Sequence, residues 1–279
     1  MKPLRRSWVW GLVLLAGLQT ASLAQSAAAE ASYVAMGSSF AAGPGLKPYA
    51  ADAPKRCGRS TSNFANQLAA RRGLSLTDVS CSAATSEAVL QAWGDIPAQI
   101  DAVTPATRLV TITIGGNDVG YIGNLMALSC NTLLVQGRVT TAQCPVSKAV
   151  TEADFSAMDR SMRAISAAIQ ARAPKARLVF VDYLTVLPPS GSCAATPLTA
   201  AQADQARAVS ARVQAITAEV ARDVGALLVA ASRLSLAHDA CSAEPWVWGY
   251  PAAAGGMPYH PNALGMAALA TALDQALPR

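Results

Sequence analysis

Five brief aliphatic runs alternate with longer helical patterns, and this alternation limits the folds open to the chain more than any other feature. The runs are rich in Val, Ile and Leu and lack the in-and-out alternation of a half-exposed strand, which is typical of strands buried on both faces. They cover residues 32–37, 74–79, 109–114, 178–181 and 226–229. Helical patterns lie at 63–72, 86–103, 154–172, 199–224 and 261–277.

This order of elements predicts an α/β fold, a three-layer α/β/α sandwich around a central, mostly parallel five-stranded sheet. The composition does not break between residues 31 and 279, so we expect one domain. Ligands of open parallel sheets bind beyond the carboxyl ends of the strands. We therefore expect any chemistry in the loops that follow Met36, Val79 and Ile114, and in the loop before the last helix.

The N-terminus has the features of a secretory signal. Three basic residues precede an apolar run at 8–18, and small residues follow. We expect a signal peptide at 1–24, with cleavage as late as residue 29 as an alternative and an uncleaved anchor as the less favoured interpretation. The mature chain, 25–279, is then secreted or periplasmic.

Export would place the six cysteines in an oxidising compartment, where disulfides form and persist. Six thiols allow about 15 pairings, and the sequence does not choose among them, although nearest-neighbour pairing closes the shortest loops. The six are Cys57, Cys81, Cys130, Cys144, Cys193 and Cys241. The chain has no Cys-x-x-Cys pair, and neither histidine lies at ligand spacing from a cysteine, so we expect no metal and no cofactor.

Small-residue turns after three of the strands carry candidate functional groups. Ser39 follows the first strand, where a turn can expose a hydroxyl, although such a segment is more often an ordinary turn or helix cap. Asn117 follows the third strand, and backbone N–H groups at 81–85 follow the second. The Gly-x-Ser-x-Gly elbow is missing around Ser39, which argues against an α/β-hydrolase.

The chain has two histidines, so the search for a general base is short. His260 lies directly before the last helical pattern, which Pro261 is suited to begin. His238 follows the fifth strand. A lone histidine is more often structural than catalytic, and we favour His260 over His238 as the base.

Taken in order, these motifs resemble the four blocks of SGNH (GDSL-like) hydrolases. Within that family, the resemblance is strongest to the secreted, disulfide-containing lipases and esterases of the actinomycete type. The blocks are Gly37-x-Ser39, Cys-Ser-x-Ala-Thr at 81–85, Gly-Gly-Asn-Asp at 115–118 and His-Pro-Asn at 260–262. They span nearly the whole mature chain. The resemblance implies a flavodoxin-like sandwich and an exported serine esterase or lipase that cleaves acyl esters.

The resemblance also implies a role for each matched residue. Ser39 attacks the ester carbonyl and His260 takes its proton. The oxyanion is bound by the backbone N–H groups of Ser39 and Ala83 and by the side-chain amide of Asn117. This assignment agrees with the chemistry, because a hydroxyl needs an adjacent base and the developing charge needs preorganised donors.

Three positions depart from the family pattern. Ser38 stands where the family usually has Asp, Ala83 where it usually has glycine, and Met257 where it commonly has the Asp of a triad. We therefore expect a Ser-His dyad in which the carbonyl of Met257, or one nearby, accepts the Nδ1–H of His260. The alternative is a carboxylate from the preceding loop, with Asp239 and Glu244 as candidates.

The expected partner is a small acyl-ester or lipid substrate, with transient contact to a lipid surface. Aromatic residues at 246–250 and Phe40 suit an acyl or aryl group, although core packing explains them equally well. The net charge of +5 is modest and no basic run is interleaved with aromatics after residue 31, so nucleic acid is not expected. A monomer is expected. The rival functions are a carbohydrate deacetylase on the same fold and a non-catalytic binding module.

Overall fold

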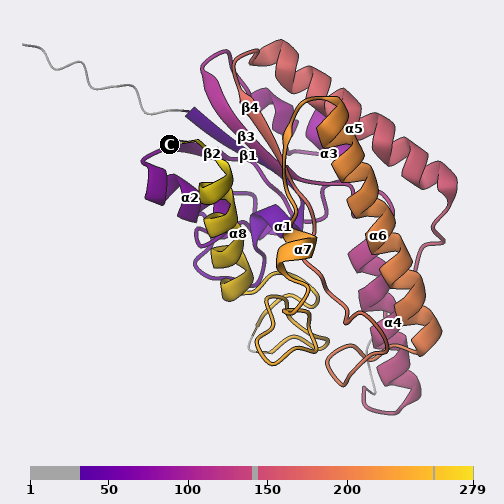
Figure 1. Cartoon of the computed structure of the whole chain (residues 1–279). Coiled ribbons are helices and arrows are strands. Elements are labelled where there is room, and N and C mark those ends of the chain that lie inside the picture. Colours follow the sequence, from indigo (N-terminus) through magenta and orange to yellow (C-terminus); the bar gives the residue numbers. More distant parts are fainter. Residues whose placement is uncertain (1–31, 140–143, 254, 279) are drawn as a thin grey trace, which may run out of the picture.

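Five parallel strands form the central sheet of the computed structural model, in the order β2-β1-β3-β4-β5 (Figure 1). All four pairings are parallel, as predicted. The structure describes residues 32–139, 144–253 and 255–278, so the expected signal peptide lies outside the described residues. The strands are β1 Ser32–Gly37, β2 Ser75–Asp78, β3 Thr107–Thr113, β4 Arg177–Val181 and β5 Leu227–Val229.

Helices cover both faces of this sheet, which completes the predicted three-layer sandwich (Figure 1). One face carries α2 Phe64–Arg72 and α8 Ala263–Ala276, and the other carries α3 Ser86–Leu90, α5 Glu152–Arg172 and α6 Ala200–Asp223. The remaining helices are α1 Ser39–Ala42, α4 Tyr121–Val135 and α7 Ala231–Leu234, with 3-10 turns at Lys55–Cys57 and Gln99–Ala102. Among the described residues, no helix has the length and apolar character needed to cross a membrane.

Local capping explains where the predicted long helices begin. Thr151 starts α5 and Thr199 starts α6, each with a reciprocal capping box to the residue three positions later. The last helix differs from the prediction at its first residue. The Asn262 side chain caps α8 by accepting the Gly265 N–H at 3.0 Å, so Pro261 precedes the helix and does not begin it.

Three elements differ from the sequence prediction. The strand β2 lies at the sheet edge and alternates between exposed and half-buried residues, since one side of it has no neighbouring strand. The helix expected at 86–103 is interrupted between α3 and the 3-10 turn, where Gly94 and Pro97 disfavour a continuous helix. The helix α4 was not predicted.

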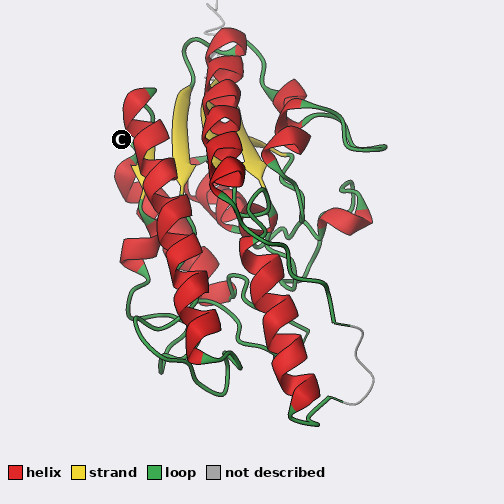
Figure 2. Ribbon diagram, turned by 90° about the vertical axis from the view of Figure 1, so that its right-hand side faces the viewer, coloured by secondary structure: helices red, strands yellow, loops and turns green. Residues whose placement is uncertain are grey.

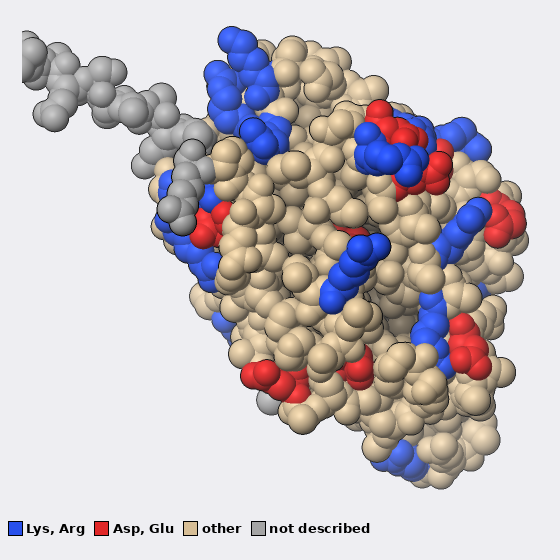
Figure 3. Space-filling view, in the orientation of Figure 1, with Lys and Arg blue, Asp and Glu red and all other residues tan. Residues whose placement is uncertain are grey.

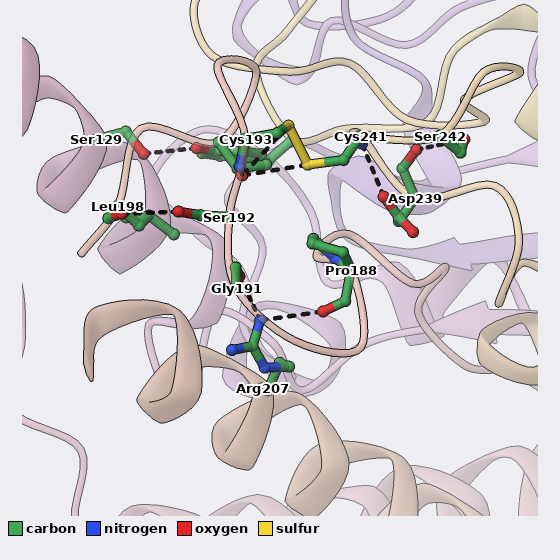
Figure 4. The surroundings of a disulfide bond; sticks show 12 residues. Ser129, Pro188, Gly191, Ser192, Cys193, Leu198, Arg207, Asp239, Cys241 and Ser242 are labelled. Carbon is green, nitrogen blue, oxygen red and sulfur yellow. Dashed lines mark hydrogen bonds between the residues drawn. A yellow bond between two sulfur atoms is a disulfide. The ribbon is translucent and has the colours of Figure 1, made fainter. Parts of the chain in front are cut away.

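All six cysteines are paired, and the pairs are nearest neighbours in the sequence. The disulfides join Cys57 to Cys81, Cys130 to Cys144, and Cys193 to Cys241. Each one ties together segments that contain irregular loop. Figure 4 shows the Cys193–Cys241 bridge, and below it the side chain of Arg207 donating to the carbonyls of Pro188 and Gly191.

The sharpest steric constraint on the sheet is at Gly37, the last residue of β1. Its φ is +123°, and an added Cβ would collide with the backbone of Thr113 on β3. The Gln99 side chain clamps the same residue, accepting from the Gly37 N–H at 2.7 Å and donating to the Gly37 carbonyl at 3.0 Å. A side chain at position 37 would therefore push β1 away from β3.

We expect Gly37→Ala to lower the free energy of unfolding by about 3 kcal/mol or more, because strained backbone and collision add together. The matched control is Gly73→Ala, which also has positive φ (+61°) but faces open space. It should lose only ~1 kcal/mol. Urea unfolding of both variants measures the difference, and equal losses would contradict the steric explanation.

Candidate active site

Ser39 and His260 are brought together at the carboxyl end of the sheet, as the sequence motifs predict. The Ser39 hydroxyl and His260 Nε2 are 2.7 Å apart, although the residues are separated by 221 positions in the chain. Ser39 begins α1 directly after β1, and His260 lies in the loop before α8. Both side chains are largely buried, with exposed fractions of 7% and 6%.

A backbone carbonyl orients the imidazole, and it belongs to Pro258. The Nδ1 of His260 is 2.8 Å from the Pro258 carbonyl oxygen, so Nδ1 carries the proton and Nε2 is free to accept one from Ser39. The expectation of the Met257 carbonyl is corrected, because that carbonyl instead accepts the backbone N–H of His260 at 3.2 Å. The chain turns at Tyr259, between Pro258 and His260, where φ is +62°.

Two short backbone segments pair to hold this loop in place. The Trp248 N–H donates to the His260 carbonyl at 2.9 Å, and the Tyr259 N–H donates to the Trp248 carbonyl at 3.1 Å. Tyr259 is fully buried, and its hydroxyl lies 2.5 Å from that of Ser129 on α4. The position of His260 therefore depends on a network that extends well beyond its own turn.

The alternative base, His238, and one alternative carboxylate, Asp239, bond to other groups. His238 stacks on the Trp246 ring at 4.0 Å, and its Nδ1 meets the Glu244 carbonyl at 2.8 Å. The Asp239 carboxylate accepts the Cys241 N–H at 2.7 Å (Figure 4). In the described parts of the chain, no hydrogen bond or ion pair joins the carboxylate of Asp239 or Glu244 to His260.

The three expected oxyanion donors lie on loops that contact one another. Asn117 Nδ2 donates to the Ala84 carbonyl at 2.9 Å, which leaves its second hydrogen available. The N–H groups of Ser39 and Ala83 have no hydrogen-bond acceptor among the described residues. Ala83 has a φ of +65°, which glycine would adopt at lower cost, by ~1 kcal/mol.

Tyr183 is a residue of this site that the sequence analysis missed. Its hydroxyl accepts the Gly116 N–H at 2.8 Å and lies 3.4 Å from the Ser38 hydroxyl, the group that replaces the usual Asp. Its ring packs 4.7 Å from that of Phe40. The available signal was its place two residues after β4, at the same edge of the sheet as Ser39.

Burial sets the protonation state of the His260 imidazole. Removal from water lowers the pKa of His260 to about 4, and the hydrogen bond to the Pro258 carbonyl offsets only part of this effect. The Phe40 ring contributes to this enclosure, with its centroid 5.3 Å from that of the imidazole. The imidazole is therefore neutral at neutral pH, the form that can accept a proton.

A buried serine hydroxyl bonded to a neutral, oriented imidazole is the arrangement of a serine hydrolase. Residues 35–268 match the model of the GDSL-like lipase/acylhydrolase family. The chain belongs to that family, and it is a carboxylic ester hydrolase.

Known lipases are similar to this chain over most of its length. It is 35% identical over 242 residues to Lipase 2 of Streptomyces coelicolor, covering 84% of this chain and 81% of that one. It is 30% identical over 236 residues to a lipase of Streptomyces rimosus, with the same coverage. The solved extracellular lipase of S. rimosus superposes with a TM-score of 0.70 at 26% identity, over 88% of this chain and 100% of that one.

We expect activity to persist well below pH 6. The buried imidazole resists protonation, so the acid limb of kcat/KM for an uncharged ester should lie near its lowered pKa of about 4 rather than near 6.5. Phe40→Ala, which admits water to the ring, should move this limb upward. A wild-type limb close to 6.5 would contradict the assignment.

Removing the Tyr183 hydroxyl should reduce turnover. In Tyr183→Phe the Gly116 N–H loses its acceptor next to Asn117, and we expect kcat to fall roughly 10-fold or more with little change in KM. Tyr33→Phe is the control, since it removes another buried hydroxyl, whose partner is Thr111 in the sheet and not this turn. Similar losses of kcat in both variants would indicate a purely structural role.

Proposed function

We propose that this enzyme hydrolyses acyl esters with Ser39 as nucleophile and His260 as general base, without a carboxylate partner. One observation carries the proposal: the 2.7 Å contact between the Ser39 hydroxyl and Nε2 of an imidazole whose other nitrogen donates to the Pro258 carbonyl. This geometry selects the tautomer that can accept the serine proton.

The reaction follows from these positions. As Ser39 Oγ attacks the acyl carbonyl, its proton passes to His260 Nε2, and the Pro258 carbonyl dipole stabilises the imidazolium. The imidazolium then returns the proton to the leaving alkoxide, and the acyl group stays on Ser39. Water, deprotonated by the same imidazole, attacks the acyl-enzyme. As the carboxylic acid leaves, the imidazolium returns the proton to Ser39 Oγ and restores the free enzyme.

The negative charge of the tetrahedral intermediate would meet three donors. These are the N–H groups of Ser39 and Ala83 and the free hydrogen of the Asn117 amide. A preorganised donor of this kind is worth roughly 3 kcal/mol in the transition state. The Cys57–Cys81 disulfide and the bond from Ser82 Oγ to the Cys57 carbonyl, at 2.7 Å, support the loop that carries Ala83.

Two partly apolar cavities lie near the site, although neither is lined by Ser39 or His260, and they suit the acyl group of an ester. Cavities of about 330 Å³ and 190 Å³ both border Tyr121. The Tyr121 ring meets that of Tyr183 edge-on at 6.0 Å, and Tyr183 in turn packs against Phe40 beside Ser39. The names of the relatives, which are lipases, favour lipid esters within this class.

Export is part of the proposal. A signal-like segment at 1–24 and three disulfides both suit a secreted or periplasmic enzyme. The solved S. rimosus relative is described as extracellular. We propose that the mature enzyme, 25–279, acts as a monomer outside the cytoplasm.

The test is hydrolysis of a chain-length series of chromogenic acyl esters by the oxidised mature enzyme. Ser39→Ala and His260→Ala should each lower kcat/KM by about 10⁴-fold or more, and Asn117→Ala by roughly 10²-fold to 10³-fold. His238→Ala and Glu244→Gln are matched controls and should retain activity. Loss of activity in Glu244→Gln would overturn the proposal that His260 has no carboxylate partner. No turnover by folded wild type would favour the deacetylase or binding module.

A further inference from the structure

The helix α4 and residues 144–150, which return along it, form an arm that extends from the active-site end of the sheet (Figures 1 and 2). The Cys130–Cys144 disulfide joins the two parts, with Cα atoms 5.5 Å apart. Asn124 and Lys148 join them again, since the Asn124 amide donates to the Lys148 carbonyl at 2.8 Å and accepts the Lys148 N–H at 2.7 Å. The arm is therefore a stiffened unit.

Large apolar side chains on this arm face solvent. Val135 is 89% exposed, Val146 is 94% exposed and Leu134 is 41% exposed. Val135 lies five residues beyond Cys130, about 7.5 Å along the helix, and Val146 lies two residues beyond Cys144. Because residues 144–148 run back toward Asn124, Val146 lies on one side of the disulfide along the arm and Leu134 and Val135 lie on the other. Single exposed apolar residues are ordinary, but a group of them marks a contact surface.

The charges of the arm favour one kind of partner. Residues 119–151 contain no Asp or Glu, while they include Arg138 and Lys148. Lys148 pairs with Asp154 at 2.7 Å, but Arg138 is exposed and forms no ion pair within the described chain. Figure 3 shows basic and no acidic side chains at the lower tip of the molecule, where Figure 1 places the end of α4. Apolar and basic groups together suit an anionic lipid surface.

The arm is also fixed relative to the active site. It begins directly after the Asn117 turn, and the Tyr121 N–H donates to the Gly116 carbonyl at 2.8 Å. At its other side, Ser129 bonds to Tyr259, the neighbour of His260. A surface held by the arm would therefore lie at the end of the molecule that contains Ser39.

We propose that this arm docks the enzyme on anionic lipid surfaces. Leu134, Val135 and Val146 enter the boundary between headgroups and acyl chains, and Arg138 pairs with the anionic headgroups. This binding does not require hydrolysis, so it stands apart from the proposed reaction.

The test is co-sedimentation of the oxidised mature protein with vesicles of phosphatidylcholine and phosphatidylglycerol, carried out in the Ser39→Ala background so that the lipid stays intact. We expect the protein to bind. The double variant Val135→Ser with Val146→Ser, and separately Arg138→Glu, should each lower the partition coefficient roughly 10-fold. Binding to vesicles of phosphatidylcholine alone should be weaker.

Matched controls distinguish docking from general stickiness. Val224→Ser with Leu264→Ser removes exposed apolar groups elsewhere, and Lys55→Glu reverses an exposed charge elsewhere; both should leave binding unchanged. With Ser39 intact, the arm variants should cleave a soluble short-chain ester at the wild-type rate, which excludes misfolding. The proposal is overturned if the unaltered protein does not bind vesicles, or if the controls reduce binding equally. Dimerisation abolished by the Val135→Ser change would instead identify a second copy as the partner.

Discussion

The hydrogen bond between the Ser39 hydroxyl and the His260 imidazole joins the beginning of the described fold to its last loop. It forms only if β1 ends at the right place and if the loop before α8 returns to it. The first condition rests on Gly37, which lets β1 lie against β3, and the second on the backbone pairing of Trp248 with Tyr259 and His260. The rest of the molecule keeps these two segments in register.

In the proposed dyad a carbonyl dipole takes the place of a carboxylate, and this changes the electrostatics of the imidazole. A carboxylate would favour the imidazolium and raise the histidine pKa. Here burial dominates and lowers the pKa of His260 to about 4, so the free enzyme holds a neutral base over a wide range of pH. The Pro258 carbonyl still fixes the tautomer, because one hydrogen bond is enough to choose which nitrogen keeps the proton.

Loops carry most of the chemistry, and cross-links compensate for their lack of regular structure. The Cys57–Cys81 bridge supports the turn of Ala83, the Cys130–Cys144 bridge stiffens the arm, and the Cys193–Cys241 bridge ties the loop after β4 to the segment before His260. A disulfide restricts the unfolded chain, which lowers the entropy lost when such loops are ordered. The same bridges thus serve stability and the geometry of the site.

The sequence by itself determined the alternating strands and helices, the parallel sheet and the pair Ser39 and His260, because these signals are local: aliphatic runs, helical periods, caps and short motifs. It placed the carbonyl that orients His260 at Met257 or nearby, whereas the structure places it at Pro258. It also missed α4 and the roles of Gln99 and Tyr183. Those features were decided only by tertiary structure. Gln99 and Tyr183 bond to backbone atoms of distant segments, 62 and 67 residues away, and no local pattern records such contacts. The Pro258 carbonyl is only two residues from His260, but the turn at Tyr259 that selects it is held by the packing of Tyr259 against other segments.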